Sequence, residues 1–153
     1  MANDLKNRVL SGEIQDPRHC QQEAIDALLT AGACVAVADG RITISERDEA
    51  VSFIERSRVA PSVTPDEIVE LFDQRTRRLE QGDFADFIVA GLRPVAGLPV
   101  SFDLIRMAER VAMADEQLHP REIQAIRLLH LITTGLPRPK VVSPVGRHCD
   151  ERA

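Results

Sequence analysis

Apolar residues recur every three or four positions along most of the chain, the spacing that places them on one face of an α-helix. The first such run follows Asp16-Pro17, where an N-cap precedes a proline at the first helical position, and it stops at Asp39-Gly40. Later runs predict helices from Thr43 to before Pro61, from Thr64 to Gln81 and from Asp83 to Leu92. Because no strand-like alternation competes with them, the pattern predicts an all-α protein.

The second half of the chain continues in the same way. After a break at Arg93–Pro99, Ser101 is expected to cap a helix whose apolar stripe runs to Met113, and His119-Pro120 begins a last helix. From Thr134 onward the chain is Pro-rich and aperiodic, which is typical of a tail that lies on the surface or is disordered. The predicted organisation is an N-terminal segment at 1–16, one helical domain at 17–133 and a tail at 134–153.

One motif occurs twice, as ADGRITISE at Ala38–Glu46 and as ADEQLHPRE at Ala114–Glu122. Each copy follows an apolar run and has an Asp, an aliphatic residue expected to be buried (Ile42 or Leu118) and a Glu seven positions after the Asp. The two aspartates are 76 positions apart, which is too far for a solenoid of short repeats. The layout predicts a single-domain helical bundle built from two pseudo-repeated helix-turn-helix units.

The acidic positions of the motif indicate cation chemistry. The first copy matches the latter half of the EF-hand calcium loop, Asp-Gly-x-Ile-x-x-x-Glu. Val35 and Val37 stand where that loop supplies further oxygen ligands, so a complete EF-hand is excluded. Calcium takes six to eight oxygens, so a divalent cation such as calcium or magnesium requires carboxylates from both copies to converge. Whether the two turns meet or lie at opposite ends of the bundle is open at this point.

Helix capping is the alternative explanation of the same residues. Thr43 with Glu46 forms a capping-box pattern, and Glu122 holds the equivalent position after His119, which is expected to be an N-cap or simply exposed. Thr64-Pro65-Asp66-Glu67 has the box without an upstream Asp. Capping therefore explains each motif Glu but not the repeated Asp, and both explanations stay open.

These residues carry a family resemblance. The first copy of the motif, Ala36–Ile42 with Glu46, resembles the TerB-like family, and the second copy, Ala112–Asp115 with Leu118 and Glu122, has the same layout. This family includes the tellurite-resistance protein TerB and the N-terminal domain of DjlA-type co-chaperones. The resemblance extends from about Ala24 to Leu131. It implies an all-helical bacterial protein with an acidic metal site, a role in tellurite resistance and stress response, and protein partners that are often membrane-associated. The ligands that it implies are Asp39, Glu46, Asp115 and Glu122.

The second copy departs from the family at one position, because Glu116 stands where the family has glycine. A residue with a Cβ adopts the left-handed backbone conformation less readily than glycine does. We therefore expect the second turn to be less suited to binding metal, unless Glu116 is itself a ligand.

Charge and composition exclude several classes of protein. A net charge of -5 argues against nucleic acid as a partner, and no apolar stretch approaches the roughly 20 residues of a transmembrane helix. The chain starts without the pattern of a secretory signal, so a cytoplasmic location is expected, with the resemblance allowing a peripheral position at the inner membrane. The three cysteines predict neither a disulfide framework nor a zinc ribbon. Cys34 is expected to lie in the core. The doublets His19-Cys20 and His148-Cys149 are expected to be exposed rather than to form a metal site.

Catalysis is not expected, because no nucleophile with a base, phosphate loop or HExxH helix accompanies the carboxylates. The alternative function is a helical protein-protein interaction module in which the acidic residues only cap helices. Its docking face would be an exposed apolar patch. The candidates, which are more simply explained as core residues, are Phe84, Phe87, Ile88 and Leu92. A homodimer is compatible with such a bundle.

Overall fold

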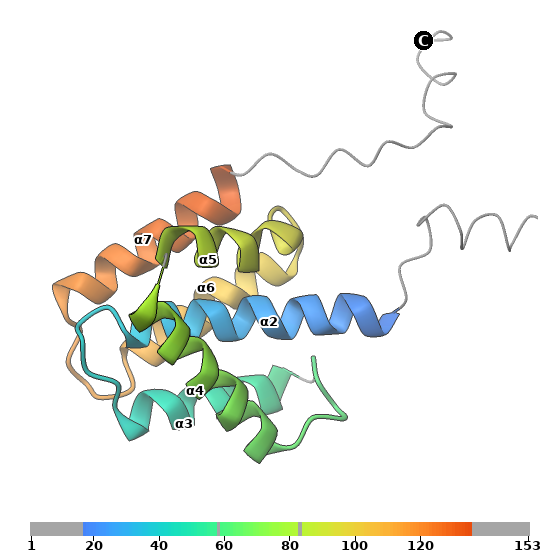
Figure 1. Cartoon of the computed structure of the whole chain (residues 1–153), viewed down its shortest axis with the longest axis horizontal. Helices are drawn as coiled ribbons and strands as arrows, with labels where there is room; N and C mark the ends of the chain where they lie inside the picture. Colours follow the sequence, from blue (N-terminus) through green and yellow to red (C-terminus); the bar gives the residue numbers. More distant parts are fainter. Residues whose placement is uncertain (1–16, 58, 83, 136–153) are drawn as a thin grey trace, which may run out of the picture.

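The computed structural model describes residues 17–57, 59–82 and 84–135 of the chain. Within these ranges it contains six α-helices, one short 3-10 helix and no strand, so the predicted all-α class is confirmed. The elements are α2 (Pro17–Ala36), α3 (Ile44–Ser57), α4 (Pro65–Gln81), α5 (Phe84–Leu92), η1 (Arg93–Val95), α6 (Val100–Ala112) and α7 (Pro120–Gly135) (Figure 1). The predicted segment 1–16 and tail residues 136–153 lie outside the described residues, as do His148 and Cys149 and the side chains of His19 and Cys20.

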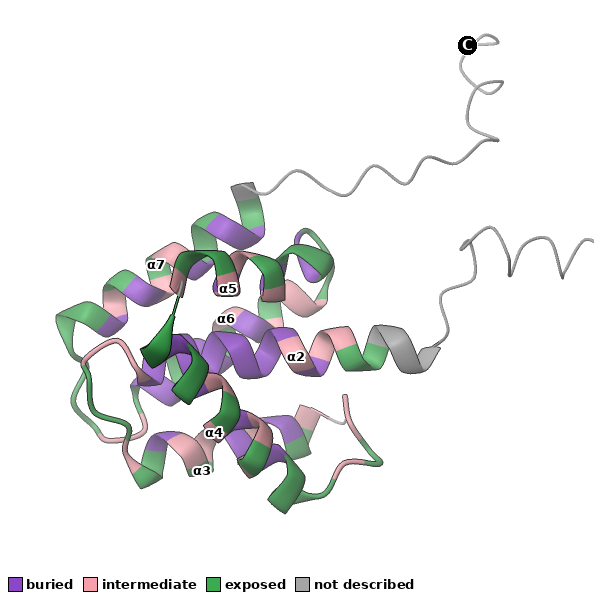
Figure 2. Cartoon of the chain, in the orientation of Figure 1, coloured by how far each residue is buried: buried purple, intermediate pink, exposed green. Residues whose placement is uncertain are grey.

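Helix α2 forms the centre of the bundle and contacts each of the other helices (Figure 1). Its second half is apolar on every face, which is the pattern of a helix enclosed by others, and it is buried throughout (Figure 2). Gly32 permits the close approach there, because a Cβ at this position would lie 2.9 Å from Cε of Met107 and 3.6 Å from the ring of Phe72. Cys34 is fully buried, as expected, and burial raises the pKa of its thiol to about 12.

The surrounding helices bury one face each. In α4 the buried face includes Ile68 and Phe72, and in α6 it includes Leu104 and Met107, each pair at helical spacing. In α5, Ile88 and Leu92 are fully buried, while Phe84 and Phe87 are half-buried against the core. The four apolar residues of this short segment are therefore core residues, in line with the simpler of the two sequence-based explanations.

Helix α6 begins differently from the prediction. Its N-cap is Pro99, without a side-chain hydrogen bond, and Ser101 lies inside the first turn, where its Oγ donates to the carbonyl of Leu98 at 2.6 Å. The prediction that Ser101 caps this helix was wrong, because the fixed φ of a proline already suits the start of a helix. Helix α7 extends to Gly135, slightly beyond the predicted end of the domain. In the described part of the chain, no helix is long and apolar enough to cross a membrane.

Candidate acidic site at the two turns

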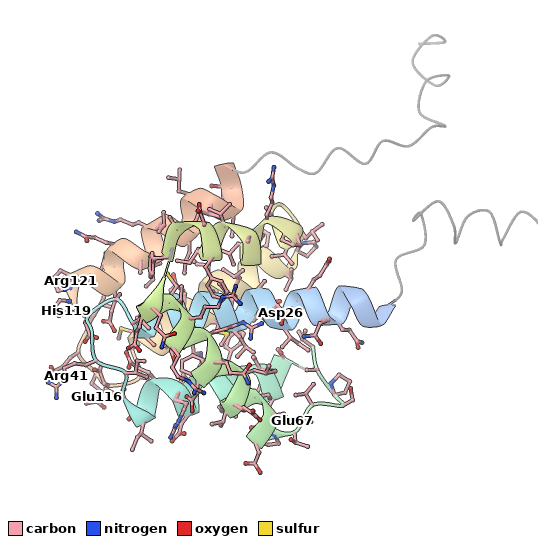
Figure 3. The ribbon with its side chains drawn as sticks, viewed as in Figure 1. Asp26, Arg41, Glu67, Glu116, His119 and Arg121 are labelled. Atoms are coloured by element: carbon pink, nitrogen blue, oxygen red, sulfur yellow. The ribbon has the colours of Figure 1, made fainter. Side chains whose placement is uncertain are left out.

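The turns between α2 and α3 and between α6 and α7 lie at the same end of the bundle (Figure 1). Arg41 of the first turn and Glu116 and His119 of the second all appear at this end (Figure 3). Glu46 and Glu122 are close enough for the charge of Glu122 to affect the pKa of Glu46. The structure therefore answers the question that the sequence left open: the two acidic turns meet.

The aspartates play the same local role in both turns. Oδ1 of Asp39 accepts a hydrogen bond from the N–H of Arg41 at 2.8 Å, and Oδ1 of Asp115 accepts one from the N–H of Gln117 at 3.1 Å. These are Asx turns, in which a side chain supplies the hydrogen bond of a backbone turn. The shared pattern accounts for the repeated Asp in structural terms. The arrangement of the whole bundle as two pseudo-repeated units stays a prediction.

Both turns also require a left-handed residue after the Asp. Gly40 has φ 83°, and Glu116, at the equivalent position, has φ 63°. The absence of glycine has therefore not prevented the second turn from adopting this conformation. A non-glycine residue there carries a steric cost of roughly 1–2 kcal/mol.

This strain predicts opposite effects for two substitutions. We expect Glu116→Gly to raise the free energy of unfolding by about 1 kcal/mol, and Gly40→Ala to lower it by a similar amount. No atom lies within 4 Å of a Cβ built on Gly40, so the effect of that change arises in the backbone. Urea unfolding of both variants measures these effects. A destabilised Glu116→Gly variant would contradict the prediction, because the Glu116 side chain would then stabilise the fold by more than its left-handed backbone destabilises it.

The two glutamates cap the helices that follow the turns. Oε2 of Glu46 accepts from the N–H of Thr43 at 2.7 Å, while Oγ1 of Thr43 accepts from the N–H of Glu46 at 3.2 Å. Oε2 of Glu122 accepts from the N–H of His119 at 2.7 Å, and Nδ1 of His119 accepts from the N–H of Arg121 at 3.2 Å. His119 is thus the N-cap of α7, one of the two roles expected for it. Both predicted capping roles are present.

These caps are unusual in being buried, with exposed fractions of 1% for Glu46 and Glu122. The pKa of Glu46 is raised to about 7, chiefly because the carboxyl is buried; the hydrogen bonds from Thr43 act to lower it, and the charges of Glu122 and Asp39 act to raise it. Among the ion pairs of the described residues, none involves Asp39, Glu46, Asp115 or Glu122. None of these four carboxylates therefore has a cationic side chain of the described residues within ion-pair distance.

The chemistry of these residues fits a hard divalent cation, because carboxylate oxygens are the donors that calcium and magnesium prefer. The distances between them, however, do not by themselves make a metal site. In the ranges that the structure describes, no three Asp, Glu, His or Cys side chains gather closely enough to hold a metal ion. The two turns thus supply suitable donors without forming a ready-made chelate, and the four-residue ligand set stays a prediction.

The aliphatic residues of the motif are placed differently from the prediction. Ile42 is 37% exposed and Leu118 is 44% exposed, so the expectation that the motif buries them was wrong. The buried side chains of these turns are instead those of Glu46 and Glu122. Ile44 and Met113 are also exposed beside the turns.

A contact between α3 and α6 supports the second turn and was not visible in the sequence. Glu49 accepts hydrogen bonds from Arg56 at 2.9 Å and from Arg110 at 3.4 Å. Arg110 lies 61 positions from Glu49, so local sequence offers no signal for this pairing. It connects the first half of α3, which follows the first turn, to the end of α6, where the second turn begins.

Comparison with known proteins bears on this architecture. A family model described as tellurite resistance protein TerB matches residues 25–133, which is more than two thirds of the chain. The match runs from within α2 to the last turn of α7 and includes both acidic turns. No curated protein and no solved structure matches the chain.

Proposed function

Because the chain belongs to the TerB family, we propose that it is a non-enzymatic binding protein of tellurite resistance or stress response that binds a divalent cation at its acidic end. The residues that would hold the ion are Asp39 and Glu46 of the first turn and Asp115 and Glu122 of the second. Calcium or magnesium suits these ligands, since all four supply carboxylate oxygens. The bound ion would supply positive charge where the protein itself places none in contact.

The observation that supports this proposal is the uncompensated charge around Glu46. Carboxylates that approach one another without a counter-ion repel, and the raised pKa of Glu46 records this repulsion in addition to the effect of burial. Each of the four carboxylates accepts a backbone hydrogen bond at one named oxygen, which leaves the other oxygen for a cation. A cation between the turns would relieve the repulsion and hold them together.

Calorimetric titration of the intact chain with calcium, magnesium, manganese and zinc tests the proposal. We expect a saturable heat for calcium or magnesium, and at least a tenfold loss of affinity in an Asp39→Asn/Asp115→Asn variant. Asparagine can still accept the hydrogen bond of each Asx turn, so the variant removes charge with little change of local structure.

The matched control is Asp66→Asn/Asp86→Asn, which removes the same charge at two exposed positions in the first turns of α4 and α5, outside the two acidic turns. If the control variant loses as much affinity as the turn variant, binding reflects net charge and not this site. Absence of any heat for all four metals in the wild type would contradict cation binding.

A protein-protein interaction module is the second candidate. The exposed Ile42, Ile44, Leu118 and Met113 beside the turns favour it, because adjacent exposed apolar side chains often mark contact surfaces. We expect an Ile42→Ser/Leu118→Ser variant to keep the melting temperature and the metal heat of the wild type. Loss of a specific bacterial partner in that variant, with metal binding intact, would support this function separately from the first.

A further inference from the structure

A groove of about 460 Å³ lies between the start of α6 and the end of α7. Because α6 ends and α7 begins at the acidic turns, the groove is at the opposite ends of these two helices. Its volume is in the range typical of ligand-binding sites. The lining side chains include Phe102, Ile105, Arg106, His130, Thr133 and Thr134.

The apolar part of the groove is formed by Phe102 and Ile105. Phe102 is 75% exposed, the highest value among the large apolar side chains of the described residues, whereas Ile105 is half-buried and packs against the core. An aromatic side chain left in solvent beside a cavity offers much apolar area for a partner to cover. Aromatic residues and arginine are also enriched among the residues that dominate protein interfaces.

The polar part of the groove favours a negatively charged group. The hydroxyls of Thr133 and Thr134 donate to carbonyls of their own helix, to Leu129 at 2.8 Å and to His130 at 2.6 Å. Within the described residues, only the backbone carbonyl of His130 takes part in a side-chain hydrogen bond and its ring makes none, and the guanidinium of Arg106 has only a 3.9 Å ion pair with Asp103. Arg106 and His130 therefore provide the available donors, on a chain whose net charge is negative.

We propose that this groove docks a peptide segment of a partner protein in which a large apolar side chain stands next to a carboxylate. The apolar side chain covers Phe102 and Ile105, and the carboxylate accepts hydrogen bonds from Arg106 and His130. This inference is independent of cation binding, because the groove shares no residue with the acidic turns.

Fluorescence polarisation with two labelled peptides tests the proposal on the intact chain. The probes are Gly-Glu-Leu-Phe-Asp-Gly and the charge-reversed Gly-Lys-Leu-Phe-Lys-Gly. We expect saturable binding of the acidic peptide and at least tenfold weaker binding of the basic one. Phe102→Ala and Arg106→Gln should each weaken the acidic peptide at least fivefold, and only Phe102→Ala should leave the salt dependence unchanged.

Two matched controls lie on α7 outside the lining of the groove: Leu131→Ala removes an exposed apolar side chain, and Arg127→Gln removes an exposed positive charge. Both should bind like the wild type. Equal binding of the two peptides, equal losses in the controls, or no saturation up to about 1 mM would overturn the proposal. So would a wild-type dimer in sedimentation that Phe102→Ala abolishes without any peptide binding, because a second copy would then be the occupant.

Discussion

At pH 8, the Glu46→Gln variant is expected to be more stable than the wild type, with a free energy of unfolding larger by about 1–3 kcal/mol. Glutamine can still accept the hydrogen bonds from Thr43, so the capping box is kept. What the substitution removes is a negative charge that is buried and repelled by Glu122 and Asp39. Urea unfolding of both proteins across the pH range measures the difference.

The pH dependence of this difference follows from the pKa of Glu46. The pKa is about 7 in the folded protein against an ordinary value of 4.5, so folding favours the protonated carboxyl. Stability from this group is fully present below pH 4.5 and is lost as the pH rises to about 7. The advantage of the glutamine variant should therefore be small at acidic pH and greatest above pH 7, with a ceiling of about 3 kcal/mol.

Glu67 provides the matched control, because it forms the same capping box with Thr64 at an exposed helix start (Figure 3). There the hydrogen bonds from Thr64 lower the pKa of the carboxyl below its ordinary value. The ionised form of Glu67 thus favours folding, and Glu67→Gln should lower stability at neutral pH, with the effect disappearing as the pH falls through that lowered pKa. Effects of the same sign at Glu46 and Glu67 would contradict the account of buried charge.

Phe72→Ala is expected to reduce the free energy of unfolding by about 3–5 kcal/mol. Phe72 is fully buried and is the largest fully buried side chain of the described residues. Its ring lies beside Gly32 at the point where α4 packs on α2, so truncation leaves a cavity next to the central helix. Denaturant unfolding followed by circular dichroism gives the value.

Phe102→Ala removes the same side chain from an exposed position and controls for the chemistry of the change. Its effect should stay within about 0.5 kcal/mol of zero. If Phe72→Ala lowered the free energy of unfolding no more than Phe102→Ala does, the space around Gly32 would have to close without a loss of stability, which is contrary to a close-packed bundle.

The helices were predictable because their signals are local. Apolar spacing and the Thr64 capping box act within a few residues, and α4 begins where the box predicts; α2 ends at Ala36, three residues before the predicted stop at Asp39-Gly40. Ser101 was misassigned because serine and proline can both start a helix, and the choice between them depends on how the preceding loop packs. The composition of the core followed from the same periodicity.

The candidate site was predictable only in part. The capping contacts of Glu46 and Glu122 involve neighbours three residues away, and sequence reasoning found them. The burial of these carboxylates, and the exposure of Ile42 and Leu118, depend on how two distant turns come together. For that tertiary arrangement, and for the groove between α6 and α7, the sequence contains no short-range signal.

The buried thiol of Cys34 allows the opening of the bundle to be measured by chemical modification. Alkylating reagents attack the thiolate, which is scarce when the pKa is about 12 and out of reach while the bundle is closed. In a chain whose other two cysteines are replaced by serine, the rate at which Cys34 is alkylated would report how often α2 becomes exposed to solvent. Comparing this alkylation rate between variants of the turns, under native conditions, would then show how often the bundle opens in each variant.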